Sequence, residues 1–181
     1  MSNSKIIACI VEGAAEKFII TKLLDENKLK FSRAKLLEEE VISVRSAKKF
    51  EEKYLSKNFE SKITVYRILD SKKEKFKLSK VYENKVDVIN IVTAPEIEIL
   101  IIINEDRYND YCKYKSSLKP SEYCKQNLKY QNVKKMDFLK DYFCDVLKLE
   151  NAIKKYKKIH KAKKGELCVA DLLKEWNFWV N

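Results

Sequence analysis

The first hundred residues alternate between short apolar runs and segments with helical spacing, and this alternation limits the fold more than any other feature. Apolar runs at 5–11, 41–46, 62–69 and 86–93 have the length and composition of buried strands. Strands that alternate with helices indicate a parallel sheet with helices on both faces. The sequence therefore predicts an α/β fold with about four parallel strands.

Helical spacing accounts for most of the remaining chain. Helices are expected at 14–29, at 46–58 after an N-cap serine, and from Pro95 to 105, while 71–84 is expected to be a loop or short helix. Beyond 105 the helical segments are 108–114, 120–130, 134–148, 149–160 and 166–178. We therefore expect an α/β core at 1–105 and a basic helical extension at 106–181, packed on the core.

Positive charge is concentrated in two segments of this chain, whose net charge is +11. Residues 113–135 hold seven lysines and one glutamate, interleaved with Tyr114, Tyr123 and Tyr130, and residues 154–164 hold seven lysines and no acid. Such segregation favours a phosphate-binding face and a nucleic-acid partner. The alternative is a lysine-rich surface that serves only solubility.

Several classes of protein are excluded by composition. The sequence contains no run of 18 uncharged apolar residues, the length needed to span a membrane. The apolar run at 5–11 is too short for a secretory signal. We therefore expect a cytoplasmic protein without membrane contact. Two glycines allow neither a GxxxxGKS loop nor a GxGxxG turn. A single histidine disfavours a Ser-His-Asp hydrolase, which leaves carboxylate chemistry.

Carboxylates follow three of the four predicted strands. Glu12 and Gly13 follow the first, Asp70 follows the third, and Glu98 lies on the apolar helix after the fourth. In a parallel sheet these side chains meet at one edge, where a divalent cation would relieve their repulsion, and Mg²⁺ or Mn²⁺ prefers such oxygen ligands. Each acid alone could instead serve as a helix cap or a first-turn charge.

These motifs resemble the Toprim domains, and in particular the RloB-like proteins of bacterial phage defence. The stretch "IVEGAAEKFII" is similar to the family's opening Glu-Gly motif, and "VYRILD" to the strand leading to its Asp motif. "NIVTAPEIEILIII" is similar to its Pro-x-x-Glu segment, through Pro95 and Glu98, and "YKSSLKPSEYCK" falls where the family is basic and variable. The resemblance covers roughly residues 5–128.

The resemblance implies a Toprim-like (Rossmannoid) sheet and a divalent-metal-dependent nuclease of abortive infection, encoded beside an AAA/ABC-type ATPase. Under it Glu12 is the general acid or base or a metal ligand, Asp70 is a metal ligand, and Glu98 completes the acidic site. Gly13 would allow the tight turn from strand to helix and a close approach to phosphate. We expect RNA, including tRNA, as the substrate more than duplex DNA, because tyrosines among the lysines could stack on unpaired bases.

The chain departs from the family's Asp-x-Asp pattern, because Lys72 stands at the second position. A protonated lysine cannot ligate Mg²⁺. Glu74 or Glu98 substitutes, or one metal binds, or the site is inactive. We expect Lys72 and Lys73 to grip a phosphate near the metal. The other expected nucleic-acid contacts are Lys115, Lys119 and Lys125.

Two alternatives to an enzyme remain open. Lys72 favours a catalytically degenerate Toprim that binds or senses nucleic acid for a partner ATPase. The second alternative is an interaction subunit whose basic extension docks on an acidic protein, with Trp176 and Trp179 as candidate anchors.

Overall fold

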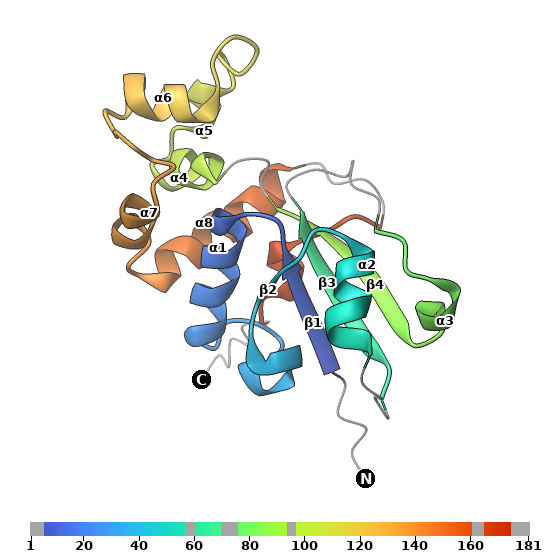
Figure 1. Ribbon diagram of the computed structural model, residues 1–181. Coiled ribbons are helices and arrows are strands. Elements are labelled where there is room, and N and C mark those ends of the chain that lie inside the picture. Colours follow the sequence, from blue (N-terminus) through green and yellow to red (C-terminus); the bar gives the residue numbers. More distant parts are fainter. Residues whose placement is uncertain (1–5, 57–60, 70–75, 94–96, 161–164, 175–181) are drawn as a thin grey trace.

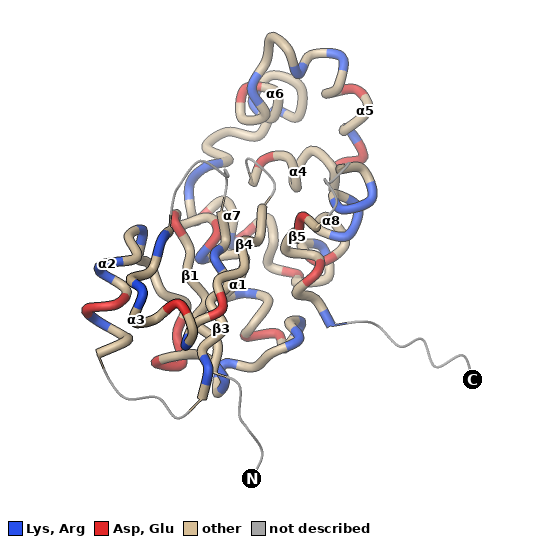
Figure 2. The backbone as a smooth tube through the Cα atoms, turned by 90° about the vertical axis from the view of Figure 1, so that its right-hand side faces the viewer, with Lys and Arg blue, Asp and Glu red and all other residues tan. Residues whose placement is uncertain are grey.

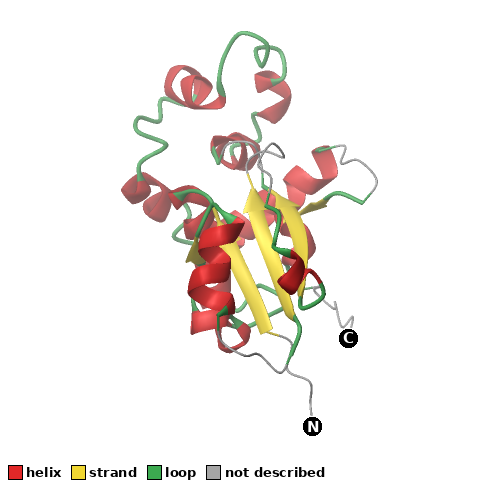
Figure 3. Cartoon of the chain, turned by 45° about the vertical axis from the view of Figure 1, so that its right-hand side comes forward, coloured by secondary structure: helices red, strands yellow, loops and turns green. Residues whose placement is uncertain are grey.

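A computed structural model of the protein describes residues 6–56, 61–69, 76–93, 97–160 and 165–174. Its centre is a five-stranded, all-parallel sheet with the order β2-β1-β3-β4-β5. Helices cover both faces of this sheet (Figures 1 and 3). The predicted α/β class is therefore confirmed. The strands are β1 (Ile6–Val11), β2 (Ile42–Ser43), β3 (Ile63–Leu69), β4 (Val86–Val92) and β5 (Leu167–Cys168).

β1 and β3 lie inside the sheet and are buried along nearly their whole length, which explains why their sequences are largely apolar. They pair in register from Ile6 with Ile63 to Val11 with Ile68. Side chains alternate between the faces of a strand, so a strand buried on both sides needs apolar residues throughout. The two strands run in the same direction and finish at the same edge of the sheet, as the sequence predicted, and the structure makes them neighbours.

One face of the sheet is covered by α1 (Ala14–Asp25), α4 (Glu98–Asn104) and α8 (Val146–Ile159). The other face is covered by α2 (Ala47–Phe50), which continues as a π-helix to Leu55, and by the short α3 (Lys80–Glu83). Ser46 caps α2 as expected, since its side chain accepts a hydrogen bond from the Lys49 amide at 3.2 Å.

Three further helices stand beyond the edge at which the strands finish (Figure 1). They are α5 (Tyr108–Tyr111), α6 (Pro120–Asn127) and α7 (Met136–Tyr142). The aromatic rings of Tyr130, Phe138 and Tyr142 pack together within this lobe. Tyr142 joins the lobe to the end of α4, because its hydroxyl accepts a hydrogen bond from the Asn104 side chain at 3.0 Å and donates one to the carboxylate of Glu105 at 2.5 Å. Burial and this hydrogen bond raise the pKa of Tyr142 far above its ordinary value.

The predicted helix at 166–178 is wrong over its described part. Leu167 and Cys168 form β5 instead, paired with Ile91 and Val92 at the end of β4, and Val169–Leu172 is a 3₁₀ helix. Leu167 and Cys168 adopt a strand because they pair with β4 and complete the edge of the sheet. The last strand thus comes from the predicted extension, and the boundary at 105–106 stays a prediction.

The boundary between the helices predicted at 134–148 and 149–160 lies earlier in the chain than expected, because α7 ends at Tyr142 and α8 begins at Val146. Asp145 caps α8, accepting a hydrogen bond from the Leu147 amide at 2.8 Å, so the break falls between Tyr142 and Val146. A carboxylate at this position satisfies an amide that has no partner within the helix.

Glu150 joins α8 to the end of α1. Its side chain is 3% exposed and pairs with Lys154 and, at 3.2 Å, with Lys28. Burial disfavours the charged carboxylate, but the hydrogen bonds from Lys154 and Lys28 outweigh burial and lower the pKa of Glu150 below its ordinary value. The folded state therefore favours the ionised form.

Replacing Glu150 tests this junction. Glu150→Gln should lower the free energy of unfolding by about 1–3 kcal/mol at neutral pH, because two lysines lose a buried counter-charge. Because the pKa of Glu150 is lower in the folded state than in the unfolded state, its carboxylate stabilises the fold at pH values above the unfolded-state pKa. This stabilisation is lost as the pH falls through the folded-state pKa. The difference from wild type, measured by urea unfolding, should therefore shrink towards about pH 3.

The matched control is Glu83→Gln, whose carboxylate is exposed at the end of α3. This change should alter the free energy of unfolding by no more than about 0.5 kcal/mol. A loss for Glu150→Gln that is equally large at neutral and at acid pH would contradict the ionic explanation.

Candidate functional site

The order of the strands reverses between β1 and β3, and this point is the first place to look for a site. The chain passes from β1 outward to β2 and then crosses to β3 on the other side of β1. Open parallel sheets bind ligands in the crevice outside the strand ends at such a reversal. Glu12 lies there, directly after Val11.

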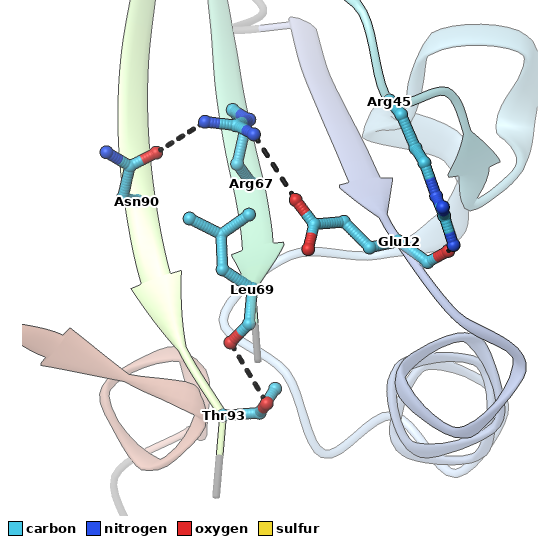
Figure 4. A network of polar contacts seen from close by, with 6 residues as sticks. All are labelled: Glu12, Arg45, Arg67, Leu69, Asn90 and Thr93. Atoms are coloured by element: carbon cyan, nitrogen blue, oxygen red, sulfur yellow. Dashed lines mark hydrogen bonds and ion pairs between the residues drawn. The ribbon is translucent and has the colours of Figure 1, made fainter. Parts of the chain in front are cut away.

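The end of β3 is held firmly at this edge. The Leu69 carbonyl accepts hydrogen bonds from the Thr93 amide at 2.8 Å and from the Thr93 hydroxyl at 3.0 Å (Figure 4). Thr93 is buried and follows β4 directly. The point at which the chain leaves β3 is therefore fixed against the neighbouring strand.

Glu12 forms an ion pair with Arg67, a residue that the sequence analysis did not single out. An Nη2–Oε1 distance of 3.3 Å joins them, and Arg67 Nη1 lies 3.4 Å from the side-chain oxygen of Asn90 (Figure 4). The guanidinium also stacks on the Phe76 ring, 4.6 Å from its centroid. The signal in the sequence was a charged residue inside the apolar run "ITVYRIL".

This ion pair is shielded from water. Arg67 is 2% exposed, and the Glu12 side chain is 12% exposed. A buried guanidinium stays protonated and therefore needs a nearby anion. Arg67 thus holds the Glu12 carboxylate in one place at the end of β1, at an edge where a ligand could reach it.

A hollow of about 370 Å³ opens beside Glu12 and carries basic and hydroxyl groups. It is formed where β2 passes into α2, and Arg45 Nη2 donates a hydrogen bond to the Glu12 carbonyl at 3.3 Å. The side chains of Arg45 and Lys49 are exposed. We call this feature the Glu12 hollow, and its lining residues are Glu12, Ser43, Val44, Arg45, Ser46 and Lys49. Two cations and two hydroxyls suit a phosphate group.

Gly13 lies at the turn from β1 into α1, where the sequence placed it, and its backbone is extended. Its φ of −129° and ψ of 172° are extended values that any residue adopts. A Cβ atom here would meet only the movable end of the Glu16 side chain, at 2.5 Å. A crowded left-handed turn is therefore not the reason for this glycine, and its approach to phosphate stays a prediction.

Glu98 is buried at the start of α4 and has a different cationic partner from Glu12. Its Oε1 lies 3.6 Å from the Nζ of Lys134, in the segment before α7, and its side chain is 3% exposed. The Cys124 thiol of α6 contacts its carbonyl oxygen at 4.0 Å. The structure thus places Glu98 against the helical lobe, next to Lys134 and α6.

The other predicted site residues are only partly described. Asp70, Lys72, Lys73 and Glu74 lie outside the described residues, as do Pro95, Trp176 and Trp179. Within the described ranges, no three His, Cys, Asp or Glu side chains are grouped closely enough to hold a metal ion. The same part of the chain contains no helix that is long and apolar enough to cross a membrane.

The lysines predicted to contact nucleic acid lie on the lobe. Lys115, Lys119 and Lys125 are all exposed in and before α6. Tyr123, expected among the stacking tyrosines, is fully buried and donates a hydrogen bond to Asp110 at 2.7 Å. Tyr123 is therefore not placed to stack on a base, whereas Tyr114 is 42% exposed.

Comparisons of the chain with protein-family models, with curated proteins and with solved structures found no match. The site is therefore interpreted from its own residues and geometry.

Arg67→Met tests whether the buried pair supports the strand ends. This change leaves the largely buried Glu12 carboxylate without its guanidinium partner. The free energy of unfolding should therefore fall by about 2–4 kcal/mol. Thermal or urea unfolding measures the loss. Arg33→Met is the matched control, because Arg33 pairs with Asp25 in the open and should lose no more than about 1 kcal/mol. Equal losses for the two variants would contradict a structural role for the Arg67 pair.

Proposed function

We propose that the protein is a divalent-metal-dependent nuclease of Toprim-like type, with its site at the ends of β1 and β3. One observation carries the proposal. Val11 pairs with Ile68 in adjacent parallel strands, and Glu12 directly follows the first strand while Asp70 follows Leu69 in the sequence. In the sequence, two acidic residues thus follow neighbouring strands whose order reverses at this point.

The donor set for a metal draws on described and undescribed residues. Glu12 supplies one carboxylate, and Asp70 and Glu74 are the residues proposed to complete the set with hard oxygen ligands. A bound Mg²⁺ or Mn²⁺ would polarise a phosphodiester and lower the pKa of a bound water.

The described residues have separate tasks in this proposal. Arg45 and Lys49 bind a phosphate of the substrate in the Glu12 hollow. Arg67 orients Glu12, and a Glu12 carboxylate oxygen accepts a proton from the attacking water. Lys115, Lys119 and Lys125 would contact the nucleic-acid backbone farther away.

The cleavage assay compares RNA, including tRNA, with single-stranded and duplex DNA, each with Mg²⁺, with Mn²⁺ and with a chelator. Glu12→Gln and Asp70→Asn should each reduce cleavage by about 100-fold or more, since each removes a charged group from the site. Glu83→Gln, an exposed glutamate on α3, serves as the matched control and should retain full cleavage. Equal cleavage by wild type and by both site variants would overturn the assignment.

A second candidate function is a nucleic-acid-binding or sensing subunit without catalysis, working with a partner ATPase. The observation that favours it is the Arg67 guanidinium, which already occupies the Glu12 carboxylate at 3.3 Å. A cation fixed in this position competes with a metal ion for the same oxygen atoms.

Calorimetric titration with Mn²⁺ separates the two functions. The nuclease should bind Mn²⁺ with heat that Glu12→Gln and Asp70→Asn abolish and that Glu83→Gln preserves. The same heat in all four proteins, or no heat in any, would instead support the subunit without a metal site.

A further inference from the structure

A second basic hollow, of about 620 Å³, lies on the side of the sheet covered by α8. Figure 2 shows α8 on one side of the sheet and α2 and α3 on the other. We call this feature the α8 lysine hollow. Its lining residues are Lys30, Lys154, Lys157, Lys158, Ala170, Asp171, Leu173 and Lys174.

Three segments that are distant in sequence bring these lysines together. Lys30 follows α1, and Lys174 follows the 3₁₀ helix after β5. The other lysines, Lys154, Lys157 and Lys158, belong to α8. The Lys30 amide donates to the Leu172 carbonyl at 2.9 Å, and the Lys174 amide donates to the Lys28 carbonyl at 2.8 Å. Backbone hydrogen bonds therefore hold the rim of the hollow in place.

Among the described residues that line the hollow, Asp171 alone carries a carboxylate, and neighbouring groups engage it. It accepts hydrogen bonds from Lys157 at 2.6 Å and from the Cys168 amide at 2.9 Å. Burial disfavours its charge, but these hydrogen bonds outweigh burial and lower the pKa of Asp171. Among the described residues, no carboxylate pairs with Lys30 or Lys158, whose side chains are exposed.

Two of the five lysines are paired, Lys154 with Glu150 and Lys157 with Asp171, which leaves an excess of positive charge around the hollow. A polyanion would relieve the remaining repulsion between the lysines. The concave shape fits a strand of phosphates better than a flat bilayer. The apolar stripe of α8, which includes Leu149, Ile153 and Tyr156, is buried in the core and not available to lipid. Lysine ammonium groups act as point charges and therefore suit a sequence-independent backbone.

We propose that the α8 lysine hollow binds the phosphodiester backbone of a nucleic-acid strand, at a surface separate from the Glu12 hollow. The inference rests on the proposed function only in taking nucleic acid as the partner. It does not require catalysis at the ends of β1 and β3. Binding here would hold the nucleic-acid strand on the face of the sheet opposite to α2 and α3.

Fluorescence anisotropy of a labelled single-stranded RNA, with divalent metal chelated, tests this surface apart from any cleavage. Lys30→Gln with Lys158→Gln should weaken binding on the order of tenfold at about 0.1 M salt. It should also reduce the slope of log affinity against log salt by about 1.4, or about 0.7 per lost contact. Lys30→Arg with Lys158→Arg keeps both charges and should bind as wild type does.

The matched control removes the same charge elsewhere. Lys80→Gln with Lys85→Gln changes two exposed lysines at α3, on the other side of the sheet, and should leave the affinity within about twofold. An equal loss in this control would overturn the proposal, because net charge alone would explain it. Binding of polyglutamate or of phosphatidylserine vesicles as tightly as RNA would overturn it as well. Failure of the cleavage assay would leave this result unaffected.

Discussion

The parallel pairing of β1 with β3 is the constraint on which the rest of the structure depends. Its register runs without interruption from Ile6 with Ile63 to Val11 with Ile68, and both strands are buried. A slip of one residue would turn every side chain of one strand to the opposite face. It would therefore separate Arg67 from Glu12 and expose apolar residues of the core. The same register places the ends of the two strands side by side.

The sequence was sufficient for the elements whose side-chain pattern has one explanation. Runs that are apolar at every position indicate buried parallel strands, and Ser46 marks the start of α2. The apolar residues at 167–173 have helical spacing, yet two of them pair with β4, because an open strand edge outweighs local preference. Arg67 was missed because pairing with Glu12 depends on strand order, which the spacing of residues does not contain.

The sequence predicted individual residues of the candidate site but not how they are arranged. Glu12 lies at the expected strand end, but its ion pair and the Glu12 hollow beside it arise from β2, β3 and α2 together. Likewise, the lysine run of α8 gains its concave surface from Lys30 and Lys174, which are distant in sequence. Basic side chains thus line two separate hollows, one where β2 passes into α2 and one beside α8. Phosphate groups are the ligands that we propose for both hollows.

The central claim is that a divalent metal binds between the chain ends of β1 and β3. Iron bound in place of magnesium, with ascorbate and peroxide, generates radicals that cut the polypeptide close to the metal. The account predicts two sets of cuts, one next to Glu12 and one at residues 69–74, and the loss of both when either Glu12→Gln or Asp70→Asn is introduced. Cuts at one strand end only, or cuts that persist in both variants, would contradict it.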